Sequence, residues 1–147
     1  YFKKEINNII KNKIKINISG RLNNLPSKIK KTLTEAVKQT KKNNKLVVNL
    51  AINYSSKYEI IDAIKKIKKN SKRISEEKIN KKLYADLPFP DILIRTGGKK
   101  RLSNFMLWQL AYTEIFFLEK LWPDFSKIDL KKIIKKFHKI KRNFGGI

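Results

Sequence analysis

Residues 91–98 read DILIRTGG. The apolar run after Asp91 predicts a short strand, and Arg95-Thr96-Gly97-Gly98 predicts a loop directly after it. Two other runs also indicate strands. Isoleucine alternates with other residues over 13–19, and residues 46–52 read LVVNLAI, which is typical of a buried strand.

Segments with helical spacing of apolar residues separate these strands. They lie at residues 2–12, 27–42, 56–67, 75–83, 103–118 and 126–144. Ser56 with Glu59, and Ser126 with Asp129, have the spacing of a capping box at a helix start. Gly145-Gly146 is expected to end the last helix. Because strands separated by helices pair in parallel, we expect a three-layer α/β/α fold with a parallel sheet.

The sheet expected from this chain is narrow. Three strands are few for a three-layer fold, since buried parallel strands need neighbours on both edges. The sequence also begins at Tyr1 without an initiator methionine. Both observations lead us to expect that N-terminal strands of a longer protein are missing from this chain.

The composition excludes several kinds of chemistry. The 147 residues include 36 basic and 12 acidic side chains, one histidine and no cysteine, for a net charge of +24. Disulfides are excluded, and any metal would be magnesium-like, with oxygen ligands. No apolar run is long enough to cross a membrane, and the first residues do not form a signal peptide, so we expect a cytoplasmic location, with peripheral attachment to a membrane as a second option.

The positive charge has two interpretations. It could mark a nucleic-acid surface, but 31 of the basic residues are lysine and only 5 are arginine, and they are spread over the whole chain. We therefore favour a general compositional bias. Each arginine then marks a position where a bidentate, planar cation is needed.

Three strand ends are candidates for an anion site. They read Gly20-Arg21, Asn53-Tyr54 and Arg95-Thr96-Gly97-Gly98, and open parallel sheets bind ligands at this edge. Arg101 and Ser103 follow at the expected start of the next helix, where free N–H groups favour phosphate. The alternative is that Gly97-Gly98 forms only a turn.

The expected helix 103–118 is apolar on almost every face, so it must be covered all round. Its only acidic residue is Glu114. From spacing alone, Glu114 is either paired at a subunit interface or a metal ligand.

The stretch PDILIRTGGKKRLSNFMLWQLAYTEIFFLEKLWPDF, residues 90–125, closely resembles the signature region of the cis-prenyltransferases, in particular the bacterial undecaprenyl diphosphate synthases. The similarity continues upstream through LAINYSSKYEIIDAI, residues 50–64, and downstream to Phe144-Gly145-Gly146. The resemblance implies that residues 1–147 are the C-terminal part of a single domain of this family.

The resemblance also implies a function. Family members are homodimers with a hydrophobic tunnel that condense isopentenyl diphosphate with an allylic diphosphate, such as farnesyl diphosphate, in the presence of Mg²⁺. The product is a polyprenyl diphosphate, a precursor of the cell wall lipid carrier, which is delivered to the membrane. By match to the family motif, Arg95, Arg101, Leu102 and Ser103 would bind the isopentenyl diphosphate, and Glu114 would help bind Mg²⁺ near the dimer interface. No catalytic residue can be assigned by this match.

The chain departs from the family pattern in several places. Lys99 replaces a glutamate, Ser55-Ser56-Lys57 replaces Gly-Gly-Arg, Arg21 replaces an aspartate, and Asn143 replaces an arginine for which the adjacent Arg142 is a possible substitute. The family's Asp-Gly-Asn segment is absent, so we expect this chain alone to be inactive. A non-catalytic fragment or partner subunit of the same fold is therefore an alternative, and a basic nucleic-acid-binding module is a weaker one.

Overall fold

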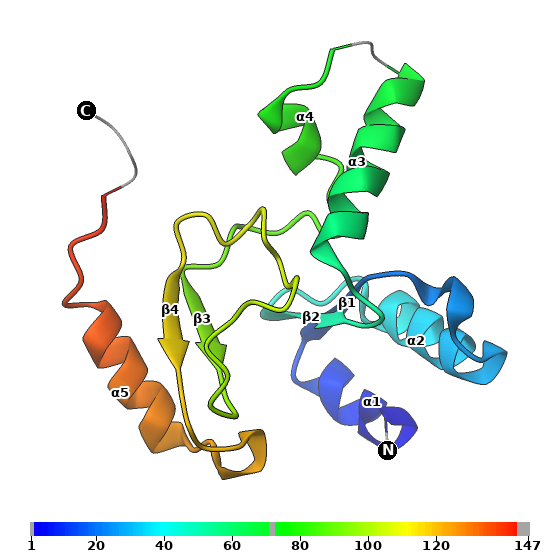
Figure 1. Ribbon diagram of the computed structural model, residues 1–147. Coiled ribbons are helices and arrows are strands. Elements are labelled where there is room, and N and C mark those ends of the chain that lie inside the picture. Colours follow the sequence, from blue (N-terminus) through cyan, green and yellow to red (C-terminus); the bar gives the residue numbers. More distant parts are fainter. Residues whose placement is uncertain (1, 71–72, 144–147) are drawn as a thin grey trace. The chain divides into compact units, whose positions relative to one another are not determined.

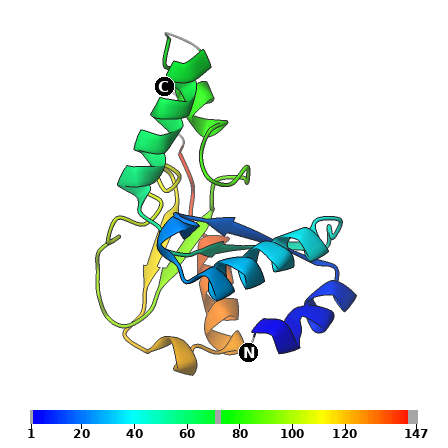
Figure 2. The ribbon, with the colours of Figure 1, turned by 90° about the vertical axis from the view of Figure 1, so that its right-hand side faces the viewer.

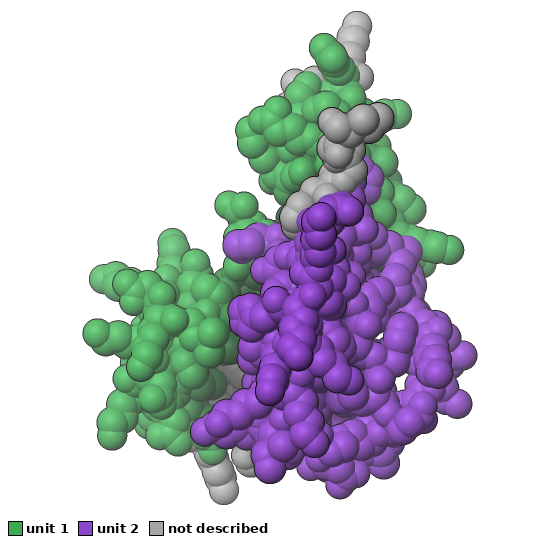
Figure 3. Space-filling model, turned by 90° about the vertical axis from the view of Figure 1, so that its left-hand side faces the viewer, with its two compact units in different colours: residues 1–87 green, residues 88–147 purple. Residues whose placement is uncertain are grey.

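The computed structural model describes residues 2–70 and 73–143, and the chain forms two compact units, residues 1–87 and 88–147 (Figure 3). Unit 1 contains α1 (Phe2–Lys11), β1 (Ile14–Ser19), η1 (Leu22–Asn24), α2 (Ser27–Thr40), β2 (Leu46–Ala51), α3 (Ser56–Asn70) and α4 (Glu76–Asn80). Unit 2 contains β3 (Ile92–Arg95), β4 (Glu114–Phe117), η2 (Trp122–Asp124) and α5 (Lys127–Phe137). Among the helices described, none combines the length and apolar character needed to cross a membrane.

Unit 1 is built on the parallel pair β1–β2, as the sequence predicts. Ile14 is opposite Leu46, and the register continues to Ser19 opposite Ala51. Helix α2 packs against β1 (Figures 1 and 2). The fully buried hydroxyl of Thr40, in the last turn of α2, accepts a hydrogen bond from the Ile16 N–H at 3.0 Å, so it ties the end of the helix to the strand.

The expectation that residues 46–52 form a buried strand is only partly correct. The strand is present, but Leu46 and Val47 are 53% and 38% exposed in the structure. An apolar run records a tendency toward burial, whereas burial itself requires neighbouring elements on both faces. Within unit 1, the helix α2 covers β1 rather than the beginning of β2.

Local capping signals predict the helix starts well. The Ser126–Asp129 capping box begins α5, and the Ser75 hydroxyl accepts from the Lys78 N–H at the start of α4. Helix α3 already includes Ser56, the predicted cap, so its capping position lies one residue earlier, where the Ser55 hydroxyl accepts from the Tyr58 N–H at 3.4 Å. Helix α5 ends at Phe137, well before Gly145-Gly146, which lie outside the described residues.

The predicted helix 103–118 is wrong. Residues 103–112 form successive turns, and residues 114–117 form β4, which pairs in parallel with β3 from Ile92 opposite Glu114 to Arg95 opposite Phe117. Ile115, Phe116 and Phe117 have high strand propensity, and pairing with β3 satisfies the backbone groups on the edge of β4 that faces it. A helical pattern in sequence cannot reveal this pairing, because the partner strand lies about 20 residues away along the chain.

Candidate functional site

The glycine loop after β3 is fixed by the segment that follows β4. The Gly97 N–H donates to Lys120 O and the Gly98 N–H donates to Leu118 O, both at 2.9 Å. Leu118 N in turn donates to Arg95 O at 2.8 Å. The two glycine amides are therefore engaged within the chain, and side chains must provide any anion contacts at this loop.

Three of the predicted site residues come together around Arg95. Its Nη1 donates to the backbone oxygen of Arg101 and to Ser103 Oγ, the latter at 3.1 Å. Nε and Nη2 of Arg95 make no hydrogen bond with the described residues, and the exposed Arg101 guanidinium likewise has no partner among them. Two guanidinium groups and one hydroxyl thus lie close together, and both guanidinium groups have N–H donors that make no hydrogen bond with the described residues.

Leu102 lies between these residues and contributes through its backbone. Its carbonyl oxygen accepts a hydrogen bond from Phe105 N at 3.0 Å, which closes a tight turn. Arg101 and Ser103, on either side of Leu102, both contact Arg95.

The expected helix N-terminus at Ser103 is not present. Ser103, Asn104 and Met106 have positive φ angles of 50°, 61° and 46°. An α-helix cannot contain this left-handed backbone, so the predicted contribution of a helix dipole to anion binding is wrong. Positive φ at non-glycine residues is costly and tends to occur where a loop conformation is required for function.

Glu114 lies apart from the arginine cluster. It is opposite Ile92 at the beginning of the strand pair, whereas Arg95 is three residues further on, or about 10 Å at 3.3 Å per residue. Its half-buried carboxylate has no ion pair or hydrogen bond in the described part of the chain. An acid without a basic partner is unexpected in a chain with 36 basic residues, and it leaves Glu114 available to a cation.

The described residues do not form a complete magnesium site. No group of three or more potential ligands occurs among residues 2–70 and 73–143. Mg²⁺ binds six oxygens, but it commonly takes only one or two from carboxylates, and water and substrate phosphates supply the others. Glu114 fits the role of one such ligand, and in that role it would need further ligands from outside the described residues.

Arg21 does not contribute a free cation to the strand ends, contrary to expectation. It forms a bidentate salt bridge with Asp62, with Nη2–Oδ1 at 2.8 Å and Nε–Oδ2 at 3.1 Å. The hydroxyl of Tyr84 donates to the same carboxylate at 2.6 Å, and the guanidinium lies 4.0 Å from the Tyr58 ring centroid. The two strand ends of unit 1 do meet, because Asn53 Nδ2 donates to Arg21 O at 2.8 Å.

The Arg21–Asp62 pair makes unit 1 sensitive to acid. Hydrogen bonds from Arg21 and Tyr84 lower the pKa of Asp62 below its ordinary value. A lowered folded-state pKa stabilises the fold above the unfolded-state pKa of about 4, and this contribution is lost as the pH falls through the folded-state pKa. We expect the urea midpoint of unit 1 to fall more steeply below about pH 4 in the wild type than in Asp62→Asn. If the urea midpoints of the wild type and of Asp62→Asn fell equally with pH, the stabilising role of the Arg21–Asp62 pair would be contradicted.

The other departures from the family pattern differ in exposure, since Ser56 is fully buried. Lys57 and Lys99 are exposed. Arg142 donates to Asp91 at 2.6 Å and to Tyr112 O at 3.1 Å, so its charge is already paired, while Asn143 is exposed. Sequence reasoning did not identify Asp62 or Asp91 as partners. With only 12 acidic residues for 36 basic ones, each acid is a candidate ion-pair partner, and this imbalance is the signal that the sequence offers.

Comparisons with known proteins show the family of this chain. Residues 1–145 match the family model described as "Putative undecaprenyl diphosphate synthase". The chain is 45% identical over 148 residues to an isoprenyl transferase of Fusobacterium nucleatum, covering all of this chain and 64% of that protein. It is also 45% identical to an isoprenyl transferase of Rickettsia sibirica, of which it covers 65%.

Solved structures show the same fold. The crystal structure of a probable undecaprenyl diphosphate synthase from Campylobacter jejuni superposes with a TM-score of 0.91 at 38% identity, covering 99% of this chain and 69% of that one. Lavandulyl diphosphate synthase from Lavandula x intermedia, in complex with dimethylallyl diphosphate, gives a TM-score of 0.91 at 29% identity and is covered to 66%. The chain thus spans about two thirds of the length of its relatives, and it belongs to the undecaprenyl diphosphate synthase family of prenyltransferases.

Proposed function

We propose that the protein containing this chain is a cis-prenyltransferase, which condenses isopentenyl diphosphate with an allylic diphosphate such as farnesyl diphosphate. The observation that carries the proposal is the cluster of Arg95, Arg101 and Ser103, together with membership of the family. A diphosphate presents several anionic oxygens, and two planar guanidinium forks with a hydroxyl match such a group well.

In the proposed reaction, the Arg95 cluster holds the diphosphate of the isopentenyl substrate. Nη1 of Arg95 fixes the loop, and Nε and Nη2 bind phosphate oxygens alongside Arg101. The Ser103 Oγ accepts from Arg95, so its own proton is available for a third hydrogen bond. Leu102 stands between Arg101 and Ser103 and begins the turn to Phe105.

Holding the diphosphate places the isopentenyl double bond for attack on the allylic carbon. The new carbon–carbon bond forms as the allylic carbon–oxygen bond breaks and diphosphate leaves with its electrons. A proton then passes from the isopentenyl unit to the released diphosphate or to water, and the electron pair of the broken carbon–hydrogen bond forms the new double bond. Repetition of this step lengthens the chain to a polyprenyl diphosphate, the proposed precursor of a cell wall lipid carrier.

Glu114 is proposed as one ligand of Mg²⁺, which would neutralise charge on the diphosphate groups. The support for this role is its half-buried carboxylate, which lacks a basic partner in the described residues. Its separation from Arg95 along the strand pair means that the metal and the isopentenyl diphosphate group would contact different parts of unit 2.

We further propose that residues 1–147 form the C-terminal part of a single domain that functions as a cytoplasmic homodimer and delivers its product to the membrane. Support comes from the relatives, which continue well beyond the matched region. The exposed Leu46 and Val47 of β2 also leave an apolar surface available for additional protein.

The test is an assay of the protein encoded by the complete reading frame that contains this chain. It would be incubated with radiolabelled isopentenyl diphosphate, farnesyl diphosphate and Mg²⁺. We expect long polyprenyl products that are lost when EDTA is added. Absence of product from the complete protein would overturn the proposal and favour a non-catalytic relative of the same fold.

A further inference from the structure

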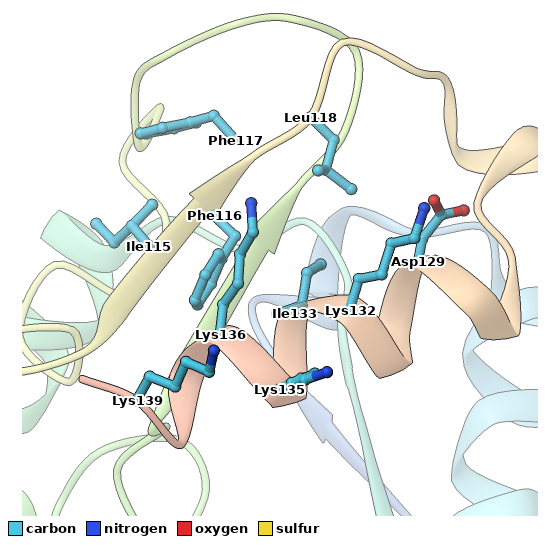
Figure 4. Close-up of a pocket in the computed structure, with 10 residues that line it drawn as sticks. All are labelled: Ile115, Phe116, Phe117, Leu118, Asp129, Lys132, Ile133, Lys135, Lys136 and Lys139. Atoms are coloured by element: carbon cyan, nitrogen blue, oxygen red, sulfur yellow. The ribbon is translucent and has the colours of Figure 1, made fainter.

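A cavity of about 470 Å³ lies in unit 2 between β4 and α5 (Figure 4), and its lining includes none of Arg95, Arg101 and Ser103. Its apolar lining comes from residues 115–118 and from Ile133, which is 4% exposed. Figure 4 shows Phe116 directed from the strand toward the helix and Ile133 directed from the helix toward the strand. This volume lies within the range of small-molecule sites, which are mostly apolar with a few polar groups.

The polar lining of the cavity is almost entirely cationic. It consists of Lys132, Lys135, Lys136 and Lys139 together with one acid, Asp129. The lysines have the spacing i, i+3, i+4 and i+7, so they follow one side of α5 and the turn after it.

None of the four ammonium groups has a hydrogen-bond or ion-pair partner within residues 2–70 and 73–143. Asp129 does not neutralise them, because its carboxylate accepts two hydrogen bonds from Lys120, at 2.9 and 2.8 Å, and two from Ser126. The helix dipole favours lysine in the last turn, which accounts for Lys135 and Lys136. The helix dipole does not account for Lys132, or for the apolar surface beside the four lysines.

We propose that this cavity binds an anionic amphiphile, with its hydrocarbon chain against residues 115–118 and Ile133 and its anionic head group among the four lysines. The chemistry of the lining selects both parts of such a ligand. An inorganic anion would leave the apolar surface uncovered, and a neutral hydrocarbon would leave the ammonium groups without a counter-charge. The site shares no residue with the Arg95 cluster, so the inference goes beyond the proposed function.

The experiment measures binding of two probes to this chain by isothermal titration calorimetry below their micellar concentrations. Dodecyl phosphate carries a straight chain and farnesyl phosphate an isoprenoid chain. We expect both to bind, and inorganic phosphate and dodecyl maltoside to bind at least tenfold more weakly. A preference for farnesyl phosphate would assign the cavity to isoprenoid amphiphiles, and equal binding would assign it to single-chain anionic amphiphiles in general.

Two double variants distinguish binding in the cavity from general electrostatic attraction of the anionic probes to a chain of charge +24. Lys132→Gln with Lys136→Gln removes two charges from the cavity, and Lys127→Gln with Lys131→Gln removes two from elsewhere on α5. We expect at least tenfold weaker probe binding in the first variant and less than twofold in the second. Equal losses, absence of probe binding, or equally strong binding of inorganic phosphate would overturn the proposal.

Arg101→Ala is the remaining control, because farnesyl phosphate could also reach the proposed diphosphate loop. Cavity binding should be unchanged in this variant. A loss confined to Arg101→Ala would place the probe at the diphosphate loop and contradict the cavity assignment. The outcome is independent of the prenyltransferase assay, since neither lysine pair belongs to the proposed diphosphate site.

Discussion

Replacing Arg101 with lysine is expected to raise the dissociation constant for isopentenyl diphosphate by about tenfold or more, equivalent to about 1.4 kcal/mol. The substitution keeps the positive charge and removes the planar fork. Because Arg101 has no ion-pair partner in the described part of the chain, its guanidinium is available to a phosphate group. Its backbone oxygen, which holds Arg95, is retained in the variant.

The measurement is calorimetric titration of isopentenyl diphosphate into the complete protein, with thermal unfolding as a check on folding. Arg73→Lys is the matched control, since it makes the same change at an exposed arginine of unit 1. We expect its affinity to equal that of the wild type. An unchanged affinity in Arg101→Lys would show that charge alone is sufficient and would contradict the bidentate role.

Replacing Gly20 with alanine is expected to destabilise unit 1 by more than about 3 kcal/mol. Gly20 has φ of +125°, and a Cβ atom at this position would lie 2.0 Å from the backbone oxygen of Ile52. The end of β2 would have to move. That movement would disturb the hydrogen bonds from Ile52 N to Ser19 O at 2.9 Å and from Arg21 N to Asn53 O at 3.3 Å.

Gly97→Ala provides the comparison for backbone strain alone. Gly97 also has positive φ, +85°, but the nearest atom to an added Cβ is Leu121 Cδ2 at 3.9 Å. We expect this variant to cost only about 1 kcal/mol in unit 2. Hydrogen exchange of the strand amides under native conditions would report each unit separately. Similar losses in the two variants would show that the contact with Ile52 does not determine the cost.

Sequence reasoning succeeded where the signal was local. The strands at 14–19, 46–51 and 92–95 follow runs of apolar residues, and Ser126 with Asp129 defines the start of α5 through contacts three residues apart. The binding roles of Arg95, Arg101, Leu102 and Ser103 come from resemblance to a family and stay a prediction. The structure adds that Arg95 holds the backbone of Arg101 and the hydroxyl of Ser103.

The failures concern partners that are distant in the sequence. Residues 103–118 have a helical pattern, yet Glu114–Phe117 pairs with Ile92–Arg95 as a strand. The sequence places Arg21 as a cation at a strand end. In the structure its charge is paired with Asp62, which is 41 residues further along the chain. The lysines of α5 have a helical spacing, but their cavity exists only because β4 packs beside that helix.

The family, the order of most elements and the residues proposed for diphosphate binding follow from the sequence alone, because these depend on spacing within short segments. Only the tertiary fold shows which arginines lack an acidic partner among the described residues, where Glu114 lies, and which lysines line an apolar cavity. These properties depend on strand pairing and ion pairs between distant segments, whose free energies are set by packing and solvent exposure rather than by local sequence.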